Sequence, residues 1–323
     1  MDYFDILKRA WSITWRYKAL WVLGLFAGAA SGGGGGGGNT GYSTGSGDFP
    51  TGAEQQFINW FSENLVLIVI LIALLAVVGL AFWVLSIAAQ GGLVYGANEA
   101  AESRAPRLGS AWGVGFRRWG RTFMIGFVVA LPVLAIVLVP VVILTTAGIG
   151  GLLTGEQGAA LALGGVCLVL PIMFVLLIAA AIIAGIVYQL ALRYGVLQDV
   201  SFGQAIKRGW SDLWGKRGAF VFWLVMIMPG IAYGFITLIL IVPFVIGMIG
   251  LVVAEQYALV AGLLVLMVLL LMIPGAIYGT FVSSAWTVFF RRMTGMEEAP
   301  VTVAADSAAF IPPPPPTPPY HEA

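Results

Sequence analysis

Long apolar runs without charge constrain this chain more than any other feature. Five such runs occupy residues 65–89, 122–149, 159–192, 219–254 and 257–290, and a shorter run occupies residues 19–30. A helix of about 20 apolar residues spans the hydrocarbon core of a bilayer. Only 10% of the 323 residues are charged, whereas soluble proteins carry about 25%. The sequence therefore predicts an all-α membrane protein with six transmembrane helices.

All 16 Lys and Arg residues lie on one side of the runs. They fall before the run at residues 19–30, after the run at residues 257–290, or in the connections that follow the runs at residues 65–89 and 159–192. The other three connections hold acidic residues and no basic ones: Asp48, Glu54, Glu63, Glu156 and Glu255. Because Lys and Arg mark the cytoplasmic side, we expect a multi-pass membrane protein with both termini cytoplasmic.

The beginning of the chain also has the pattern of a signal peptide. A basic region precedes the apolar residues 19–27, and small residues follow at Ala27, Gly28 and Ala29. Cleavage there would leave five spans. We favour the uncleaved form, because the basic sequence motif before this run recurs at internal positions that a signal peptidase would not meet.

The basic motif is KRAWSITW at residues 8–15. It recurs as KRGWSDLW at residues 207–214, and a weaker copy lies at residues 108–121. A second motif, G-x-[VI]-Y-[GQ], recurs at residues 92–96, 185–189 and 275–279. These positions lie near the ends of the runs at residues 65–89, 159–192 and 257–290, which are the second, fourth and sixth runs along the chain (the even runs). Internal similarity of this kind indicates a repeated structural unit. We predict a membrane domain over residues 1–292, built from three parallel two-helix repeats at about 1–100, 101–200 and 201–292. Each repeat begins with an interfacial amphipathic helix.

The first of these short helices places Phe4, Trp11 and Trp15 on one face when its residues are set 100° apart, with Arg9 and Arg16 on the other. Trp prefers the headgroup level, and basic amphipathic helices lie in the membrane interface. Two interpretations stay open, simple anchoring and a site for anionic lipid. The candidate lipid-binding residues are Lys8, Arg9, Trp11, Trp15, Arg117, Arg118, Trp119, Lys207, Arg208, Trp210 and Trp214.

Two segments have biased composition. The first outer loop, residues 31–62, contains seven consecutive glycines and is typical of flexible coil rather than of a phosphate-binding loop, since no Lys-Ser/Thr pair follows. Residues 293–323 form a Pro-rich tail that we expect to be disordered and cytosolic. Its PxxP spacing suits either a solvated spacer or a segment that binds a protein partner.

The predicted spans contain few groups that could perform chemistry. They hold no Asp, Glu, Lys or His, and the single Cys167 and single His321 rule out the usual metal-ligand sets. We therefore expect no enzyme activity, metal, cofactor or nucleic-acid partner. The acidic residues Glu99 and Glu102, and Glu297 in the tail, are expected to be solvated.

The polar residues near the inner ends of the even runs allow a second kind of site. Gln90, Tyr95, Tyr188, Gln189 and Tyr278 could line the inner mouth of a central cavity. The three tyrosines could equally form an aromatic belt at the headgroup level.

The opening FDILKRAWSITWRYK, the element FGQAIKRGWSDLW and the G-x-[VI]-Y motifs resemble a group of bacterial six-span proteins. The chain is similar, over about residues 1–292, to the membrane region attached to some glycerophosphodiester phosphodiesterases and to stand-alone relatives of that region. The resemblance implies a six-helix membrane bundle in a bacterial plasma (inner) membrane. It does not imply phosphodiesterase activity, which belongs to a soluble barrel domain for which this chain has no room.

These observations favour a non-enzymatic integral membrane protein. We expect a scaffold or accessory subunit that touches the lipid bilayer, and anionic lipids in particular, through its amphipathic helices. The alternative is a transporter or channel for a small uncharged or amphipathic compound, which would need a polar track through the bundle.

Overall fold

The computed structural model describes residues 2–30, 64–216, 218–254 and 256–297, which are helical throughout apart from short connections. The glycine-rich loop and nearly all of the proline-rich tail lie outside these residues. The helices are α1 (Tyr3–Arg16), α2 (Leu20–Ala30), α4 (Leu65–Ala101), α5 (Leu108–Arg117), α6 (Trp119–Leu197), α7 (Phe202–Gly215), α8 (Gly218–Val253) and α9 (Tyr257–Met293). The all-helical prediction is thus confirmed for the described part of the chain.

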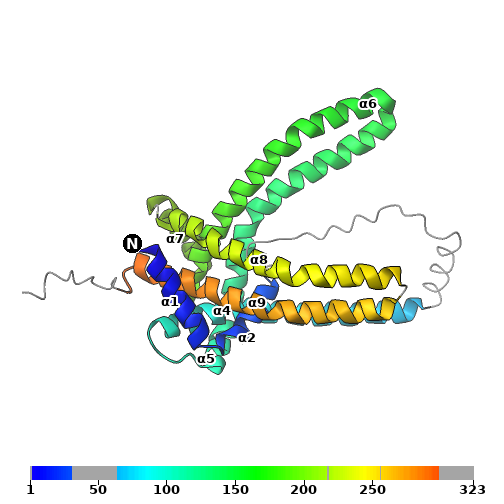
Figure 1. Cartoon of the computed structure of the whole chain (residues 1–323). Coiled ribbons are helices and arrows are strands. Elements are labelled where there is room, and N and C mark those ends of the chain that lie inside the picture. The colour runs from blue at the N-terminus through cyan, green and yellow to red at the C-terminus, as the bar shows by residue number, and fades with distance from the viewer. Residues whose placement is uncertain (1, 31–63, 217, 255, 298–323) are drawn as a thin grey trace, which may run out of the picture.

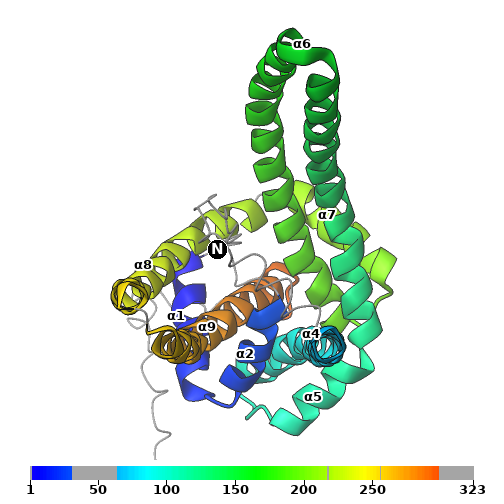
Figure 2. The ribbon, with the colours of Figure 1, turned by 90° about the vertical axis from the view of Figure 1, so that its right-hand side faces the viewer.

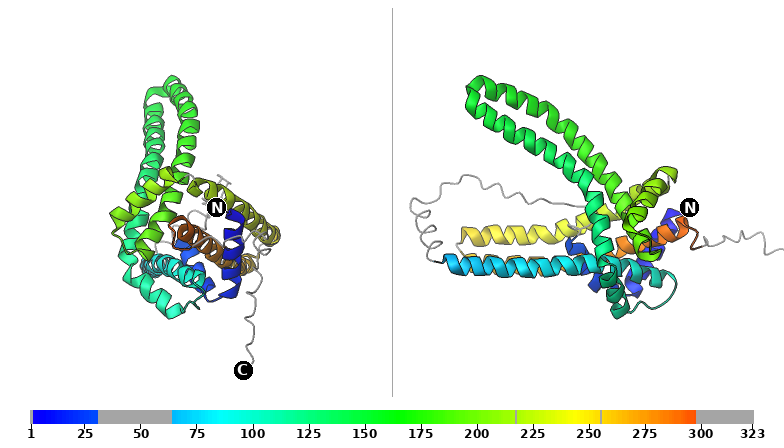
Figure 3. Two further views of the ribbon diagram at one scale, coloured as in Figure 1. Left: turned by 90° about the vertical axis from the view of Figure 1, so that its left-hand side faces the viewer. Right: turned by 180° about the vertical axis from the view of Figure 1, so that it is seen from behind.

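The molecule consists of a hub and long arms. The short helices α1, α2, α5 and α7 gather at one end of the molecule, which we call the hub. One end of each long helix, and both ends of α6, lie there as well (Figure 1). The outer parts of α4, α8 and α9 extend together from this hub, and Figure 2 looks along them from their far ends. Helix α6 folds back on itself as a hairpin that leaves the hub at an angle to the other arms (Figure 3).

Within the residues that the structure describes, five helical segments are long and apolar enough to cross a membrane. They are Leu65–Ala101, Trp119–Val142, Leu170–Leu197, Gly218–Val252 and Ala258–Met293. The sequence places its first span at residues 19–30, where α2 has only 11 residues. A helix of that length rises about 16 Å, roughly half the hydrocarbon thickness. Helix α2 ends at Ala30, where the described residues stop.

The arms are apolar all round and exposed. In α4, for example, Val66 is 72% exposed and Leu75 is 60% exposed. A helix that is hydrophobic on every side belongs in a protein core or in a membrane. Because a helix satisfies its own backbone hydrogen bonds, such arms are stable when lipid surrounds them.

The buried core lies in the hub, where small residues allow close helix packing. A Cβ atom on Gly92 of α4 would lie 2.7 Å from the carbonyl oxygen of Ala111 in α5, and one on Gly115 of α5 would collide with the carbonyl of Ala88 in α4. Only glycine permits this approach. The close contact fixes α5 against the inner half of α4.

Helices α1 and α7 pack in a similar way. Helix α1 lies against α9, and α7 lies against the second arm of α6, where Gly209 faces Ala191. Helix α1 buries a stripe formed by Ile6, Ala10 and Ile13, and Asp2 caps its first turn by accepting hydrogen bonds from the amides of Phe4 and Asp5. In α1, α5 and α7, a stripe of small or aliphatic residues thus packs against the hub. The opposite face of each of these helices is exposed.

Candidate functional site

The free faces of α1 and α7 carry tryptophan pairs. Trp11 and Trp15 are 52% and 44% exposed, and Trp210 and Trp214 are 51% and 65% exposed. The two rings of each pair contact one another, with centroids 5.6 Å and 6.0 Å apart. The buried stripe anchors each helix to the hub. These tryptophans can therefore contact solvent or lipid outside the protein.

The basic residues nominated with these tryptophans divide into two groups. Lys8, Arg117, Lys207 and Arg208 are exposed on the short helices. Arg208 also donates a hydrogen bond of 3.1 Å to Gln198. Arg9, in contrast, donates to Glu297 and, at 2.8 Å, to the carbonyl oxygen of Ala101.

The nominated residues after α5 are engaged within the protein. Arg118 forms an ion pair of 3.4 Å with Asp199. The indole N–H of Trp119 donates to the carbonyl oxygen of Val84 at 3.1 Å. The third short helix therefore offers fewer free groups than α1 and α7, although Phe116 is 49% exposed.

A cluster of charges joins the end of α9 to α1 and α4. Arg291 donates a hydrogen bond of 2.6 Å to Glu102, and Arg292 donates to Asp5. Glu297 accepts from Arg9 and lies within 3.5 Å of both Arg291 and Arg292. The Glu297 side chain is only 10% exposed. The expectation that Glu297 is solvated is therefore wrong, because the fold brings distant arginines onto its carboxylate. Glu102 keeps partial exposure, at 27% of its side chain, but is paired with Arg291.

These contacts affect ionisation. The hydrogen bond from Arg291 lowers the pKa of the Glu102 carboxyl below its usual range, although partial burial acts in the opposite direction. The hydrogen bond from Arg121 likewise lowers the pKa of the exposed Asp199 carboxyl. Both carboxylates are therefore held in their charged forms at neutral pH.

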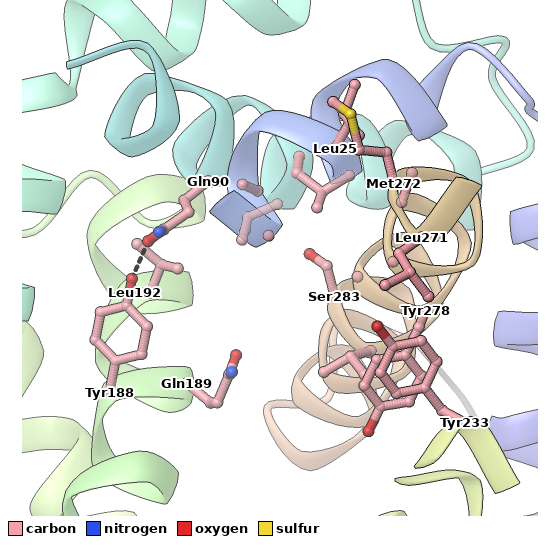
Figure 4. A pocket seen from close by; sticks show the side chains of 18 of the residues that line it. Leu25, Gln90, Tyr188, Gln189, Leu192, Tyr233, Leu271, Met272, Tyr278 and Ser283 are labelled. Carbon is pink, nitrogen blue, oxygen red and sulfur yellow. Dashed lines mark hydrogen bonds between the residues drawn. The ribbon is translucent and has the colours of Figure 1, made fainter. Parts of the chain in front are cut away.

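A cavity of about 400 Å³ lies on the hub side of the spans, between α2, α4, the second arm of α6, α8 and α9 (Figure 4). Its polar wall is made by the side chains of Gln90, Tyr188, Gln189, Tyr233, Tyr278 and Ser283. The rest of the wall is largely apolar and includes Leu25, Leu93, Val268, Leu271 and Met272.

Two pairs of side chains organise the polar wall. The hydroxyl of Tyr188 donates to the amide oxygen of Gln90, which ties α6 to α4. The rings of Tyr233 in α8 and Tyr278 in α9 stack with centroids 4.2 Å apart. Each ring extends across a glycine of the opposite helix, because a Cβ on Gly230 would lie 3.2 Å from the Tyr278 hydroxyl and one on Gly275 3.6 Å from the Tyr233 hydroxyl.

Arg193 lies directly behind this wall and is fully buried. Its guanidinium donates to the side-chain oxygen of Gln189 at 2.8 Å and to the carbonyl oxygen of Ser283 at 3.0 Å. None of the ion pairs among the described residues includes Arg193. A buried charge without an opposite charge is unusual and marks a candidate functional position in a membrane protein.

The structure brings together four of the five residues nominated for a cavity, namely Gln90, Tyr188, Gln189 and Tyr278. Tyr95 instead packs against a small cluster formed by Val94, Leu192 and Val196. Sequence reasoning did not nominate Tyr233, Ser283 or Arg193. The signal for Arg193 was available, since Gln189 and Arg193 are four residues apart in an otherwise apolar stretch and so share one helix face.

A family model described as a family of unknown function (DUF7544) matches residues 12–293, so the chain belongs to that family. Comparison with curated proteins and with solved structures finds no match. The resemblance to the membrane region of glycerophosphodiester phosphodiesterases therefore stays a prediction.

Proposed function

We propose that this member of the DUF7544 family is a non-enzymatic, six-span protein of the bacterial plasma membrane that binds anionic lipids at the cytoplasmic face. It acts in this proposal as a scaffold or accessory subunit, and its short helices α1, α5 and α7 are the lipid-contacting elements. The observation that carries the proposal is the pair of exposed tryptophans on both α1 and α7, set beside exposed lysines on helices whose other face is buried.

The position of the first long helix supports a sixth crossing. Helix α1 lies in the hub, whereas α4 begins at Leu65 at the far end of the arms (Figure 1). The chain between them must therefore pass from one end of the molecule to the other. An uncleaved α2 is the apolar segment suited to begin that passage.

The packing of the short helices supports three parallel repeats arranged in a ring. The short helix that begins each repeat lies against the second span of the repeat before it. Helix α5 lies on α4, α7 lies on the second arm of α6, and α1 lies on α9. The last contact closes the ring, because the first unit receives the third. This arrangement presents all three short helices on the same face of the membrane.

Lipid binding is tested most directly by native mass spectrometry in mild detergent with added phosphatidylglycerol or phosphatidylcholine. We would remove one exposed basic residue from each short helix in the triple variant K8Q/R117Q/K207Q. Each basic residue near an anionic surface contributes about 1 kcal/mol. We expect the wild type to retain phosphatidylglycerol preferentially, and the triple variant to lose that preference by roughly tenfold or more.

The matched control removes the same charge outside the three helices, in K18Q/R104Q/R107Q. All three side chains are exposed in the connections at the same end of the molecule. A control that loses as much phosphatidylglycerol as the helix variant would overturn the proposal, because net positive charge alone would then account for binding. Equal retention of both lipids by the wild type would overturn it as well.

The cavity favours a second candidate function, transport of a small uncharged or amphipathic compound. Gln90, Gln189 and the tyrosines Tyr188 and Tyr278 supply polar groups within an otherwise apolar bundle. Flux of such compounds into liposomes that contain the purified protein tests this candidate. Flux no faster than in protein-free liposomes argues against it.

A further inference from the structure

We propose that the cavity between α2, α4, α6, α8 and α9 binds the anionic head of a membrane amphiphile, a carboxylate or a phosphate ester, while the acyl chain leaves toward the lipid. This site is separate from the exposed faces of α1, α5 and α7. It holds whether or not those helices bind lipid.

The two glutamines of the cavity present hydrogen-bond donors. Arg193 has only donor groups, so the side-chain oxygen of Gln189 must face it, as the 2.8 Å contact requires. The Tyr188 hydroxyl likewise occupies the oxygen of Gln90. Both amide NH₂ groups are then left for the cavity, and these groups can donate to a ligand but cannot accept from it.

Ser283 adds a hydroxyl without a partner. The residue is 9% exposed, and its Oγ atom makes no hydrogen bond within the described residues. Ser283 lines the cavity, and Figure 4 shows its hydroxyl pointing toward the side of the cavity on which Gln90 lies. A buried hydroxyl without a partner costs free energy, so a ligand that accepts a hydrogen bond there recovers that cost.

The charge around the cavity has one sign. Arg193 lies behind Gln189 and Ser283, with hydrogen bonds to both, and no acidic residue is present among the described residues that line the cavity. A positive charge in a region of low dielectric constant acts strongly on a nearby group. Together with the donors, it favours an anionic head over a neutral or cationic one.

The apolar side of the cavity leads to the membrane. Val268 and Met272 of α9 line it and are 48% and 40% exposed, in contrast to Leu93 at 3% on the inner side. The cavity therefore opens sideways onto the lipid-facing surface of α9. Its volume lies in the range of sites that hold small ligands, which suits a head group and the start of a chain.

The test compares three probes that share one acyl chain: oleate, oleoyl lysophosphatidate and mono-oleoylglycerol. Binding to the purified full-length protein in detergent would be measured by native mass spectrometry. We expect both anionic probes to bind more tightly than the neutral glyceride. Comparing oleate with the lysophosphatidate shows whether the site prefers a carboxylate or a phosphate ester.

Two variants change the head-group site without removing the contacts of Arg193. S283A removes the hydroxyl that has no partner, and we expect anionic probes to bind roughly tenfold more weakly. Q189E keeps an oxygen for Arg193 but replaces the amide donors with a negative charge. We expect a larger loss for both anionic probes and little change for mono-oleoylglycerol.

The neighbouring serine supplies the matched control. Ser284 is also buried and its Oγ also lacks a hydrogen bond within the described residues, but it does not line the cavity. S284A should bind all three probes as the wild type does, and thermal unfolding of each variant checks that it is folded. The proposal is wrong if folded S283A and Q189E bind the anionic probes as tightly as S284A, or if the wild type prefers the neutral glyceride.

Discussion

At the scale of single residues, charged groups in the hub act as ties between elements that are far apart in sequence. Arg291 and Glu102 are 189 positions apart, and Arg9 and Glu297 are 288 positions apart. The side chains of Arg291 and Glu297 are 9% and 10% exposed. Removing one partner of such a pair leaves the other charge buried and uncompensated.

The substitution E102Q keeps the shape of the side chain but removes its charge. We expect a loss of about 1–2 kcal/mol of stability at pH 7, the difference between a charged and a neutral hydrogen-bond acceptor. Because the folded pKa of Glu102 is lowered, its contribution is complete above the ordinary value of about 4.3 and is lost as the pH falls through the folded value. The stability gap between wild type and E102Q should therefore shrink below about pH 4.

Thermal unfolding in detergent at pH 7 and at lower pH, followed by near-ultraviolet circular dichroism, measures this gap. The control is R104Q, which removes the other ion-pair partner of Glu102, a side chain that is 71% exposed. Exposed pairs contribute little, so R104Q should change stability much less. A gap for E102Q that is absent at pH 7, or that does not depend on pH, contradicts the assignment.

At the scale of elements, small residues decide where the short helices dock. Gly115 in α5 touches the backbone of α4, and a Cβ atom on Gly209 in α7 would lie 3.2 Å from the backbone of α6. Helix α5 also contains glycines that face open space, Gly109 and Gly113. The same residue type thus has two different consequences within one helix.

We expect G115A to destabilise the protein by about 1–3 kcal/mol, because the added methyl collides with the Ala88 carbonyl and forces the helices apart. G113A adds the same methyl where no atom lies within 4 Å, so it should be neutral or stabilising by up to about 1 kcal/mol through helix propensity. Hydrogen exchange of the α5 amides, together with thermal unfolding, distinguishes the two variants. Similar behaviour of both would show that α5 does not dock tightly on α4.

At the scale of the whole molecule, the separation of hub and arms predicts how the protein lies in a membrane. The short helices lie at one end, and the connection between α8 and α9 lies at the other (Figure 1). Lipid can surround the exposed arms, while the charged hub remains at the membrane surface. This division predicts which positions are accessible from each side.

The topology can be tested with single cysteines in a C167S background, labelled with a membrane-impermeant maleimide. Cysteines at Ser12 in α1 and Ser211 in α7 should react only after the cells are permeabilised. Cysteines at Thr44 in the glycine-rich loop and at Ala254 between α8 and α9 should react in intact spheroplasts. Labelling of Ser12→Cys from outside, together with Thr44→Cys, would contradict the six-span arrangement. The intact mass of the purified protein shows whether the first span is retained.

The sequence by itself determined the all-helical class of the protein and the position of its long apolar helices. Apolar runs and their length predict long helices in lipid, and five apolar segments among the described residues agree with that prediction for five of the six expected spans. The 3.6-residue periodicity grouped Phe4, Trp11 and Trp15 on one face of α1, and all three are exposed, but it did not show that Ile6, Ala10 and Ile13 form the buried stripe or that Arg9 is paired within the protein. Apolar runs and helix periodicity are local properties, so they can be read without knowing what packs against what.

Only the tertiary structure decided which residues meet. Glu102 and Glu297 look like solvated carboxylates until the end of α9 brings Arg291 and Arg292 to them. Arg193 looks like the cytoplasmic end of a span, but α9 covers it and its guanidinium reaches the carbonyl of Ser283, 90 residues away. Burial and pairing depend on contacts between elements distant in the chain, which hydropathy and periodicity do not encode. The polar cavity and the charged hub are therefore products of packing, whereas the membrane-spanning character is a product of composition.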